Sequence, residues 1–198
     1  MDIAARIRAI LHAEAEAIRS IRVDDTFERA LVAMEGCPGK IITVGMGKAG
    51  FVARRFAATL ASTATPAFYI HPSEAAHGDL GHIDTGDCLI AFSTSGKTRE
   101  VLECIEMARH LNSTGKVIGI TSHPDSGLRD LADIVLDMGV IEEPCPLGLT
   151  PTASIAAMSA IADALTLTLM ERKGVTREAY GVRHHGGYLG RKARLDNV

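Results

Sequence analysis

The stretch 87-DCLIAFSTSGKTREVLECIEMARHL-111 decides the fold, because it contains a strand, a turn and a helix in direct succession. Residues 87–93 form a nearly continuous apolar run, which is typical of a strand in a parallel sheet that is covered on both faces. Residues 98–111 then carry apolar side chains at helical spacing. Parallel strands need such a helix to return the chain to the starting edge of the sheet. We therefore expect an α/β fold.

The same alternation of apolar runs and helical patterns extends over most of the chain. Strands are predicted at 40–47, 65–71, 87–93, 116–122 and 133–139. Helices are predicted at 2–20, 23–34, 48–63, 98–111 and 152–174, with a short helix and loop at 72–83 and a short helix at 126–132. The sheet should therefore be parallel and covered by helices on both faces. Ligands of such folds bind at the carboxyl ends of the strands.

The length of 198 residues suits one domain. We expect a helical arm over residues 1–35, an α/β core over 36–172 and a tail over 173–198. Two helices allow finer predictions. Asp24 or Asp25 should cap the helix at 23–34. The helix at 48–63 should turn its large apolar side chains inward, namely Phe51, Phe56 and Leu60.

Composition excludes several classes of partner. The net charge of -3 argues against nucleic acid, because phosphate backbones select basic surfaces. We find no stretch that approaches the roughly 18 apolar residues of a membrane helix and no signal-peptide hydrophobic region, so we expect a cytoplasmic protein with no membrane partner.

The four cysteines are Cys37, Cys88, Cys104 and Cys145. They have no short paired spacing, so we expect buried thiols rather than a disulfide framework or a zinc cluster.

Residues 93–98, STSGKT, form a turn that suits a phosphate monoester. A Walker loop is excluded because an alanine stands where its first glycine would fall. Ser93, Ser95 and Thr98 surround Gly96 at a predicted helix N-terminus. Free N–H groups and the helix dipole favour an anion there, and the hydroxyls add donors. The alternative is an ordinary helix cap by Ser95.

Residues 45–50, GMGKAG, fit the glycine pattern of a dinucleotide-binding turn. That fold needs an acidic residue about 20 positions further on, at the end of the second strand, to hold a ribose. His71 stands there instead. We therefore interpret the glycines as a tight turn with a close backbone approach, and we do not expect a nicotinamide cofactor.

Other candidate residues each have a structural alternative. His77 and His82 could hold a metal, but their spacing fits no regular helix face, so a sugar-hydroxyl contact or a packed loop residue is favoured. Glu142 and Glu143 are candidate proton shuttles in a loop, or simply exposed acids. His184 precedes a glycine pair, where it can approach a substrate or remain on the surface.

Five segments, taken together, resemble the SIS (sugar isomerase) domain of bacterial D-arabinose-5-phosphate isomerases from about residue 40 to 193. They occur in the order VGMGKAG, LASTATPAFYIHPSEAAHGDLG, STSGKTRE, EPCPLGLTPT and HHGGYLGRK. The third segment alone is typical of the whole SIS superfamily. The HPSEAAHGDLG and CPLGLTPT segments resemble the arabinose-5-phosphate branch.

The resemblance implies a three-layer αβα sandwich around a five-stranded parallel sheet. It implies an aldose–ketose isomerase that interconverts D-ribulose 5-phosphate and D-arabinose 5-phosphate through an enediolate, feeding Kdo synthesis for lipopolysaccharide or capsule. It also implies a homotetramer whose active sites are completed by a neighbour's residues. The ligand would be a small sugar phosphate, with no cofactor and no required metal.

The family's site residues carry over one at a time. The phosphate group would be held by the turn at 93–98. Among the catalytic residues, Lys48 would polarise an oxygen or steady the enediolate, and Glu100 would orient that lysine or a sugar hydroxyl. Glu143 would shuttle the proton, while His184 would assist ring opening or share the role of base. His77 matches a histidine that can hold an inhibitory zinc in the family.

Three departures from the family pattern affect these expectations. Ala49 replaces a serine that supplies a phosphate hydroxyl, and His185 replaces the proline after the active-site histidine. The sequence also stops before the tandem CBS domains of longer members. Two alternatives therefore stay open: an isomerase of a hexulose or heptulose phosphate, and a non-catalytic sensor that binds a sugar phosphate.

Overall fold

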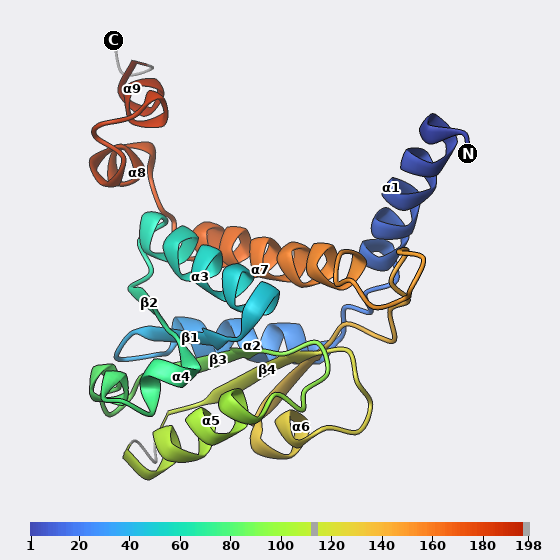
Figure 1. Ribbon diagram of the computed structural model, residues 1–198. Coiled ribbons are helices and arrows are strands. Elements are labelled where there is room, and N and C mark those ends of the chain that lie inside the picture. Colours follow the sequence, from blue (N-terminus) through green and yellow to red (C-terminus); the bar gives the residue numbers. More distant parts are fainter. Residues whose placement is uncertain (112–114, 196–198) are drawn as a thin grey trace.

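The computed structural model describes residues 1–111 and 115–195. At its centre lies a five-stranded sheet in the order β2-β1-β3-β4-β5 (Figure 1). All neighbouring strands pair in parallel. The strands are β1 (Ile41–Gly45), β2 (Ala67–Ile70), β3 (Cys88–Phe92), β4 (Val117–Thr121) and β5 (Ile134–Asp137). The predicted α/β fold and its five strands are confirmed.

Helices connect the strands and extend the chain at both ends (Figure 1). The longer helices are α1 (Ile3–Arg19), α2 (Asp25–Glu35), α3 (Gly47–Ser62), α5 (Arg99–Leu111) and α7 (Ala153–Arg172). The shorter ones are α4 (Pro72–Ala75), η1 (Asp79–His82), α6 (Gly127–Leu131), α8 (Arg177–Arg183) and α9 (Tyr188–Leu195). Asp24 caps α2 by accepting the backbone N–H of Thr26 at 3.0 Å, as the sequence predicts.

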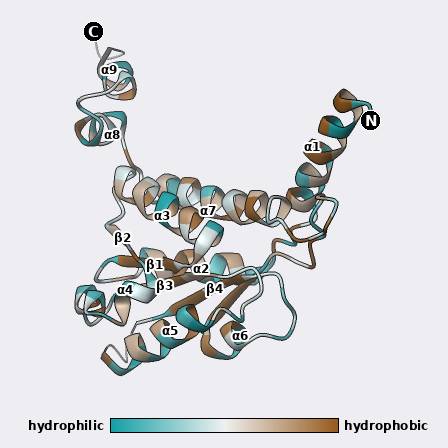
Figure 2. Ribbon diagram, in the orientation of Figure 1, coloured by the Kyte–Doolittle hydropathy of each residue, from teal (hydrophilic) through white to brown (hydrophobic). Residues whose placement is uncertain are grey.

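The sheet has a separate hydrophobic core on each face. Successive residues of a strand point to opposite faces, so Ile41 and Ile90 lie in a cluster with α2, α3 and α7. Ile42 and Leu89 lie in a second cluster with α5 and α6. Figure 2 shows the strands as hydrophobic and the outer sides of the helices as largely hydrophilic. The expected three-layer αβα sandwich is confirmed.

The two N-terminal helices differ in how they meet the core. Phe27, Ala30 and Met34 of α2 are buried in the cluster with α3 and α7. Helix α1 instead extends away from the sheet (Figure 1), and Ile3 and Ile7 on it are exposed. The expected arm over residues 1–35 therefore divides, because α2 belongs to a covering layer and α1 projects from it.

One inward prediction for α3 is wrong. Phe56 and Leu60 are buried, but Phe51 is 73% exposed. Phe51 is five residues before Phe56, which places it well off the buried stripe of a helix with 3.6 residues per turn. The side chain lies in the first turns of α3, near the carboxyl edge of the sheet.

Helix α7 is long and apolar enough to cross a membrane, by length and composition only, so the expectation that no stretch approaches this is wrong. Half of its most apolar window is buried inside the structure. The buried residues recur at helical spacing, as with Met158, Ile161 and Leu165. They pack against the sheet in the cluster with α2 and α3, and this burial accounts for the apolar sequence.

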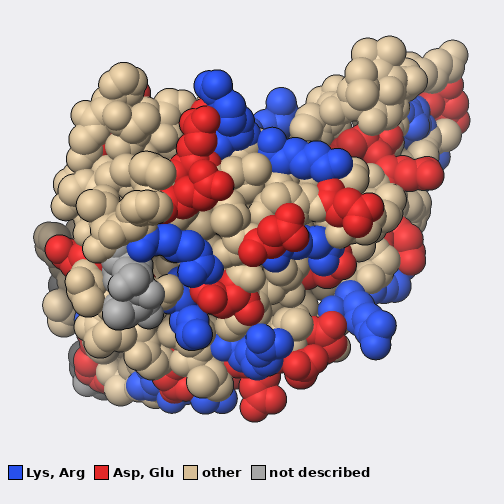
Figure 3. All heavy atoms as spheres, turned by 90° about the horizontal axis from the view of Figure 1, so that it is seen from below, with Lys and Arg blue, Asp and Glu red and all other residues tan. Residues whose placement is uncertain are grey.

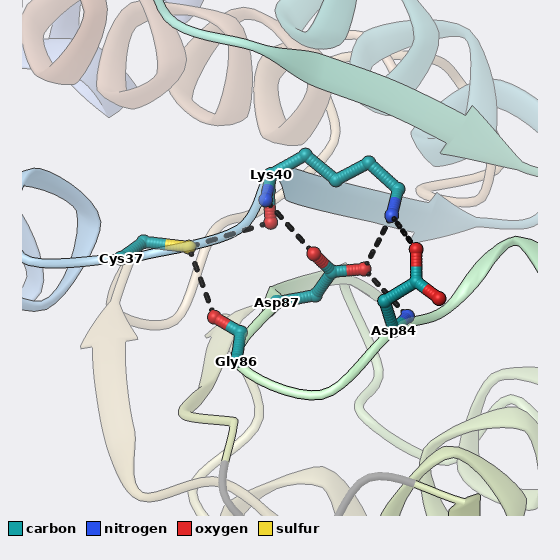
Figure 4. A network of polar contacts seen from close by, with 5 residues as sticks. All are labelled: Cys37, Lys40, Asp84, Gly86 and Asp87. Atoms are coloured by element: carbon teal, nitrogen blue, oxygen red, sulfur yellow. Dashed lines mark hydrogen bonds and ion pairs between the residues drawn. The ribbon is translucent and has the colours of Figure 1, made fainter.

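A polar network ties the amino ends of β1 and β3 together (Figure 4). The Lys40 ammonium lies 2.8 Å from the buried Asp87 and 2.9 Å from Asp84. Asp87 also accepts the backbone N–H of Lys40 at 2.8 Å. Burial raises the pKa of Asp87, but its hydrogen bonds to Lys40 and Asp84 outweigh this and hold the pKa below its usual value. Cys37 joins the network by donating to the carbonyl of Gly86 at 3.3 Å.

The face formed by α5 and α6 carries acidic and basic side chains in alternation (Figure 3). Arg109 pairs with Asp133 at 3.2 Å, and Arg129 pairs with Asp137 at 2.7 Å. Interspersed charges of both signs are typical of a solvated surface and unlike the basic stripe of a nucleic-acid-binding protein.

The cysteines only partly fit the prediction of buried thiols. Cys88 and Cys104 are buried, whereas Cys37 and Cys145 are half-buried. All four are free thiols. The difference follows from position, because Cys88 and Cys104 lie on the inner sides of β3 and α5 and the other two lie in loops.

Candidate active site

The turn after β3 is closed by its own hydroxyl groups. Ser93 Oγ lies 2.9 Å from Thr98 Oγ1 and accepts the backbone N–H of Gly96 at 3.0 Å. Ser95 Oγ accepts the N–H of Lys97 at 3.2 Å. Ser93 and Gly96 are buried, whereas Ser95 and Lys97 are exposed. The turn therefore presents Ser95 and the start of α5 to solvent, an arrangement that favours an anion.

The glycine loop at 45–50 is a tight turn, as predicted. A Cβ atom added at Gly50 would lie 2.5 Å from the carbonyl oxygen of Gly45, so only glycine fits. Gly47 has a φ of +56°, which glycine adopts without strain. Lys48 follows on the first turn of α3 and is exposed. Ala49 is half-buried against the core cluster with α3 and α7.

The strand register brings these two loops to the same edge of the sheet. Gly45 at the end of β1 pairs with Phe92 at the end of β3. The loop with Lys48 and the turn that begins at Ser93 therefore leave the sheet side by side. This is the carboxyl edge, where parallel α/β folds bind their ligands.

His77 and Glu100 line one cavity of about 480 Å³ between α4, η1 and α5. Leu80 and Met107 contribute apolar walls to it, and Arg99 contributes a cation. Because Arg99 and Glu100 open α5 directly after the turn at 93–98, the cavity begins beside the proposed phosphate position. Its volume is in the range of small-ligand pockets.

Glu143 is engaged by the N-terminus of α7. Its carboxylate accepts the backbone N–H groups of Thr152 at 2.8 Å, Ala153 at 2.9 Å and Ser154 at 3.2 Å, and it also binds the hydroxyl of Ser154. Burial raises the pKa of Glu143, but the hydrogen bond from the Ser154 hydroxyl and those from the backbone outweigh it and hold the pKa below its usual value. In this conformation the carboxylate is a helix cap.

His184 lies far from these loops in the described chain. It ends α8, its ring stacks on Tyr180 with centroids 3.9 Å apart, and its Nδ1 lies 3.0 Å from the Tyr180 carbonyl oxygen. The preceding Arg183 lines a cavity with Lys40 and Ala67, at the amino ends of β1 and β2. Figure 1 also shows α8 and α9 beyond the end of α7 that is remote from the 139–151 loop. The chain therefore does not bring His184 to its own turn at 93–98.

The loop at 121–126 follows β4 at the carboxyl edge of the sheet, and the sequence analysis chose no residue in it. Thr121 and Ser122 both donate their hydroxyls to the carbonyl oxygen of Thr94 at 3.1 Å. Ser126 is buried against Gly96. The available signal was the hydroxyl-rich stretch TSHPDS directly after a predicted strand, next to the turn in the sheet.

The two loop histidines do not converge. His77 lines the cavity beside α5, whereas His82 contacts Phe68 with tilted rings whose centroids are 5.0 Å apart, and it lines a different cavity. Over residues 1–111 and 115–195 there is no group of three or more histidine, cysteine, aspartate or glutamate side chains that could hold a metal ion.

The model of the SIS domain matches residues 36–168 of this sequence. The chain belongs to the SIS domain family. This chain is 43% identical to "Arabinose 5-phosphate isomerase KdsD" of Shigella flexneri over 173 residues. The aligned region covers 87% of this chain and 52% of the relative. The chain thus spans about half the length of the curated relatives that it matches.

Solved structures resemble this SIS chain over nearly its whole length. A "putative phosphosugar isomerase involved in capsule formation" from Bacteroides fragilis has a TM-score of 0.91 and 43% identity, covering 94% of this chain and 99% of that one. The Escherichia coli CFT073 protein c3406, solved in complex with A5P, has a TM-score of 0.88 and 34% identity, with coverages of 92% and 97%.

Proposed function

We propose that this chain is an aldose–ketose isomerase that interconverts D-ribulose 5-phosphate and D-arabinose 5-phosphate through an enediolate. The observation that carries the proposal is the hydroxyl-lined turn at 93–98 beside a ligand-sized cavity. Support comes from the relatives named arabinose 5-phosphate isomerase and from the similar protein that binds A5P. The reaction would feed Kdo synthesis in the cytoplasm.

The phosphate would be bound by Ser95 and the N-terminus of α5, with Ser93 and Thr98 holding the turn in shape. The sugar would then extend from the turn into the cavity beside Glu100 and His77. Fixing the phosphate positions the far end of the sugar, where the chemistry occurs. Lys48, on the adjacent loop, would polarise the oxygen that carries charge in the enediolate.

The proton between C1 and C2 needs a base. Glu143 is ionised at neutral pH, but its carboxylate is engaged by α7, which makes it a weak base in this conformation. His184 is the stronger candidate, because imidazole is the commonest general base. It lies at the opposite end of the sheet from the turn, so it would reach the site from a second copy of the chain.

We accordingly propose that the enzyme is a homo-oligomer, namely a homotetramer, whose active sites are shared between copies. The chain would act as one SIS domain with α1 as an arm and residues 173–198 as a tail that serves a neighbour's site. No cofactor is needed, because an enediolate mechanism moves only protons.

A second phosphosugar isomerase activity remains a candidate because of one residue. Ala49 packs against the core where the family carries a serine, so the loop at 45–50 lacks a hydroxyl that would contact the substrate. A hexulose or heptulose phosphate would use the same phosphate turn with a different sugar contact.

The test is isomerisation of D-arabinose 5-phosphate by the purified protein in the presence of EDTA, read as ribulose 5-phosphate formed. His184→Ala should reduce turnover at least about 100-fold, the usual worth of a general acid–base group. Thermal stabilisation by arabinose 5-phosphate without turnover would make the protein a sensor. Turnover only with hexose or heptose phosphates would move the activity to the second candidate.

A further inference from the structure

The phosphate turn rests on a second loop, which runs from the end of β4 to α6. The carbonyl oxygen of Thr94 accepts the Thr121 hydroxyl, the Ser122 hydroxyl and the Ser122 backbone N–H, each at 3.1 Å. Two residues further on, the carbonyl oxygen of Gly96 accepts the N–H of Leu128 at 3.0 Å. The position of the turn is therefore set by the 121–128 segment as well as by β3.

Gly96 is the point where the two segments are closest. Its φ of +62° lies in the left-handed region, which favours glycine. A Cβ atom added there would lie 2.2 Å from Ser126 Oγ and 2.9 Å from Thr121 Oγ1. The Ser126 hydroxyl is thus packed directly against the backbone of the phosphate turn.

This hydroxyl is unsatisfied. Ser126 is 8% exposed, and its Oγ is fully buried and has no hydrogen-bond partner among residues 1–111 and 115–195. The residue precedes α6 at the N-cap position, but its side chain makes no cap hydrogen bond there. A buried hydroxyl without a partner destabilises a protein, and native structures contain few of them.

The neighbouring hydroxyls, unlike that of Ser126, have hydrogen-bond partners. Ser93 and Thr98 bond to each other, and Thr121 bonds to Thr94, so each is satisfied within the protein. Among the fully buried side-chain hydroxyls of residues 1–111 and 115–195, Ser126 Oγ is the one without a hydrogen-bond partner. Its Oγ packs against Gly96, and the 13-residue helix α5 begins at Arg99, three residues after that glycine.

We infer that Ser126 is a further residue of the phosphate site. Its buried hydroxyl completes its hydrogen bonding only when a bound phosphate group shifts the turn at 93–98 and exposes Oγ, which then donates to a phosphate oxygen or to the water that this oxygen holds. This inference rests on the proposed function of the 93–98 turn. It assigns to the β4–α6 loop a direct part in phosphate binding, which offsets the missing hydroxyl at Ala49.

The inference predicts that one substitution affects stability and ligand affinity in opposite directions. Ser126→Ala removes a hydroxyl that is unsatisfied in the free protein, so the melting temperature should stay the same or rise. The same change removes a hydrogen bond from the bound state, so affinity for arabinose 5-phosphate and for inorganic phosphate should fall roughly two- to tenfold. In turnover, KM should rise by the same factor while kcat is unchanged.

Thr166→Val is the matched control. Thr166 is 1% exposed and its hydroxyl donates to the Ala162 carbonyl at 2.9 Å inside α7, away from the turn. This variant should leave ligand affinity unchanged. Affinity is measured for wild type and both variants by isothermal titration with arabinose 5-phosphate and with inorganic phosphate, and stability by thermal melts without ligand.

The outcomes separate the two proposals. If the wild type binds arabinose 5-phosphate and Ser126→Ala binds it equally well, the role of Ser126 is refuted while the proposed function stands. If Ser126→Ala has a lower melting temperature and its loss of affinity is accounted for by the loss of stability, the residue is structural and the inference fails. If the wild type binds neither ligand, the proposed function and the inference fail together.

Discussion

The Glu143 carboxylate accepts the backbone N–H of Ala153 at 2.9 Å, so the acid that the sequence nominates as proton shuttle also caps α7. A carboxylate held at a helix N-terminus is stabilised in its charged form by the N–H groups and the helix dipole. Any catalytic role of Glu143 is therefore coupled to the stability of the longest helix.

Replacement of this cap should have a pH-dependent effect. The folded-state pKa of Glu143 is lowered from 4.5, so its stabilisation is present above that pH and is lost as the pH falls through the folded-state value. Glu143→Gln should destabilise the protein by about 1 kcal/mol at pH 7. Urea unfolding at neutral and acid pH should show this difference shrinking in acid, and the control Glu142→Gln, at an exposed neighbour that does not cap α7, should change stability at pH 7 less than Glu143→Gln. A constant difference at every pH would contradict the cap.

Shared active sites predict complementation between inactive variants. His184→Ala and Lys48→Ala should each be inactive because one lacks the tail residue and the other a residue of the loop at 45–50. Mixed oligomers combine an intact loop from one copy with an intact tail from the other, so refolding the two together should restore activity. Activity is assayed before and after mixing, with each variant refolded alone as the control. No recovery in verified mixed oligomers would mean that His184 serves its own chain.

Gly96→Ala should damage the phosphate turn more than a comparable change elsewhere. Gly96 and Gly174 have φ values of +62° and +60°, but an added Cβ meets Ser126 at Gly96 and nothing within 4 Å at Gly174. Gly174→Ala should cost about 1 kcal/mol from backbone strain alone. Gly96→Ala should cost more and should also weaken arabinose 5-phosphate binding. Equal losses of stability in urea unfolding would show that the contact with Ser126 is unimportant.

Ala64→Gly should stabilise the protein. Ala64 follows the C-cap of α3 and has a φ of +68°, a conformation in which a Cβ atom is strained. Relief of the strain exceeds the extra entropy that glycine has in the unfolded chain, so the gain should be about 0.5–1 kcal/mol. Chemical denaturation measures it, and arabinose 5-phosphate turnover should not change. A loss of stability would mean that the Ala64 methyl group contributes more by packing.

Cys145 should be the most reactive thiol at neutral pH. Hydrogen bonds from the backbone and side chain of Thr150 and from the backbone of Leu149 lower the pKa of Cys145 to about 6. Burial raises the pKa of Cys88 to about 12 and that of Cys104 to about 11. Brief treatment with iodoacetamide at pH 7, followed by peptide mass spectrometry, should label Cys145 first, since the thiolate is the nucleophile. Preferential labelling of Cys88 or Cys104 in the folded protein would be inconsistent with this structure.

Much of the fold could be predicted because it depends on local patterns. The apolar runs at β1, β3 and β4 are buried on both faces, so their sequences could not suit an exposed edge. The apolar composition of α7 could be read from the sequence, but its burial and the exposure of Phe51 could not. Whether an apolar side chain is covered depends on which element packs on it, and only the assembled layers decide that.

The candidate site was predictable in part. The turn at 93–98 and the glycine loop could be predicted from residue types. Glycines indicate a tight turn with a close backbone approach, and hydroxyl residues before a helix indicate an anion site. The sequence by itself thus determined which segments form strands, that the sheet is parallel, and where the phosphate turn lies. These properties depend on side-chain periodicity and backbone freedom, which are local.

The tertiary structure alone decided how those parts are used. It packs Ser126 against Gly96, makes Glu143 the N-terminal cap of α7, and holds the tail with His184 toward the amino ends of β1 and β2, away from the turn. Each of these relationships joins separate elements of the fold or holds them apart. The physical reason is that burial, hydrogen-bond partners and distance arise from packing between elements, which no local sequence pattern encodes.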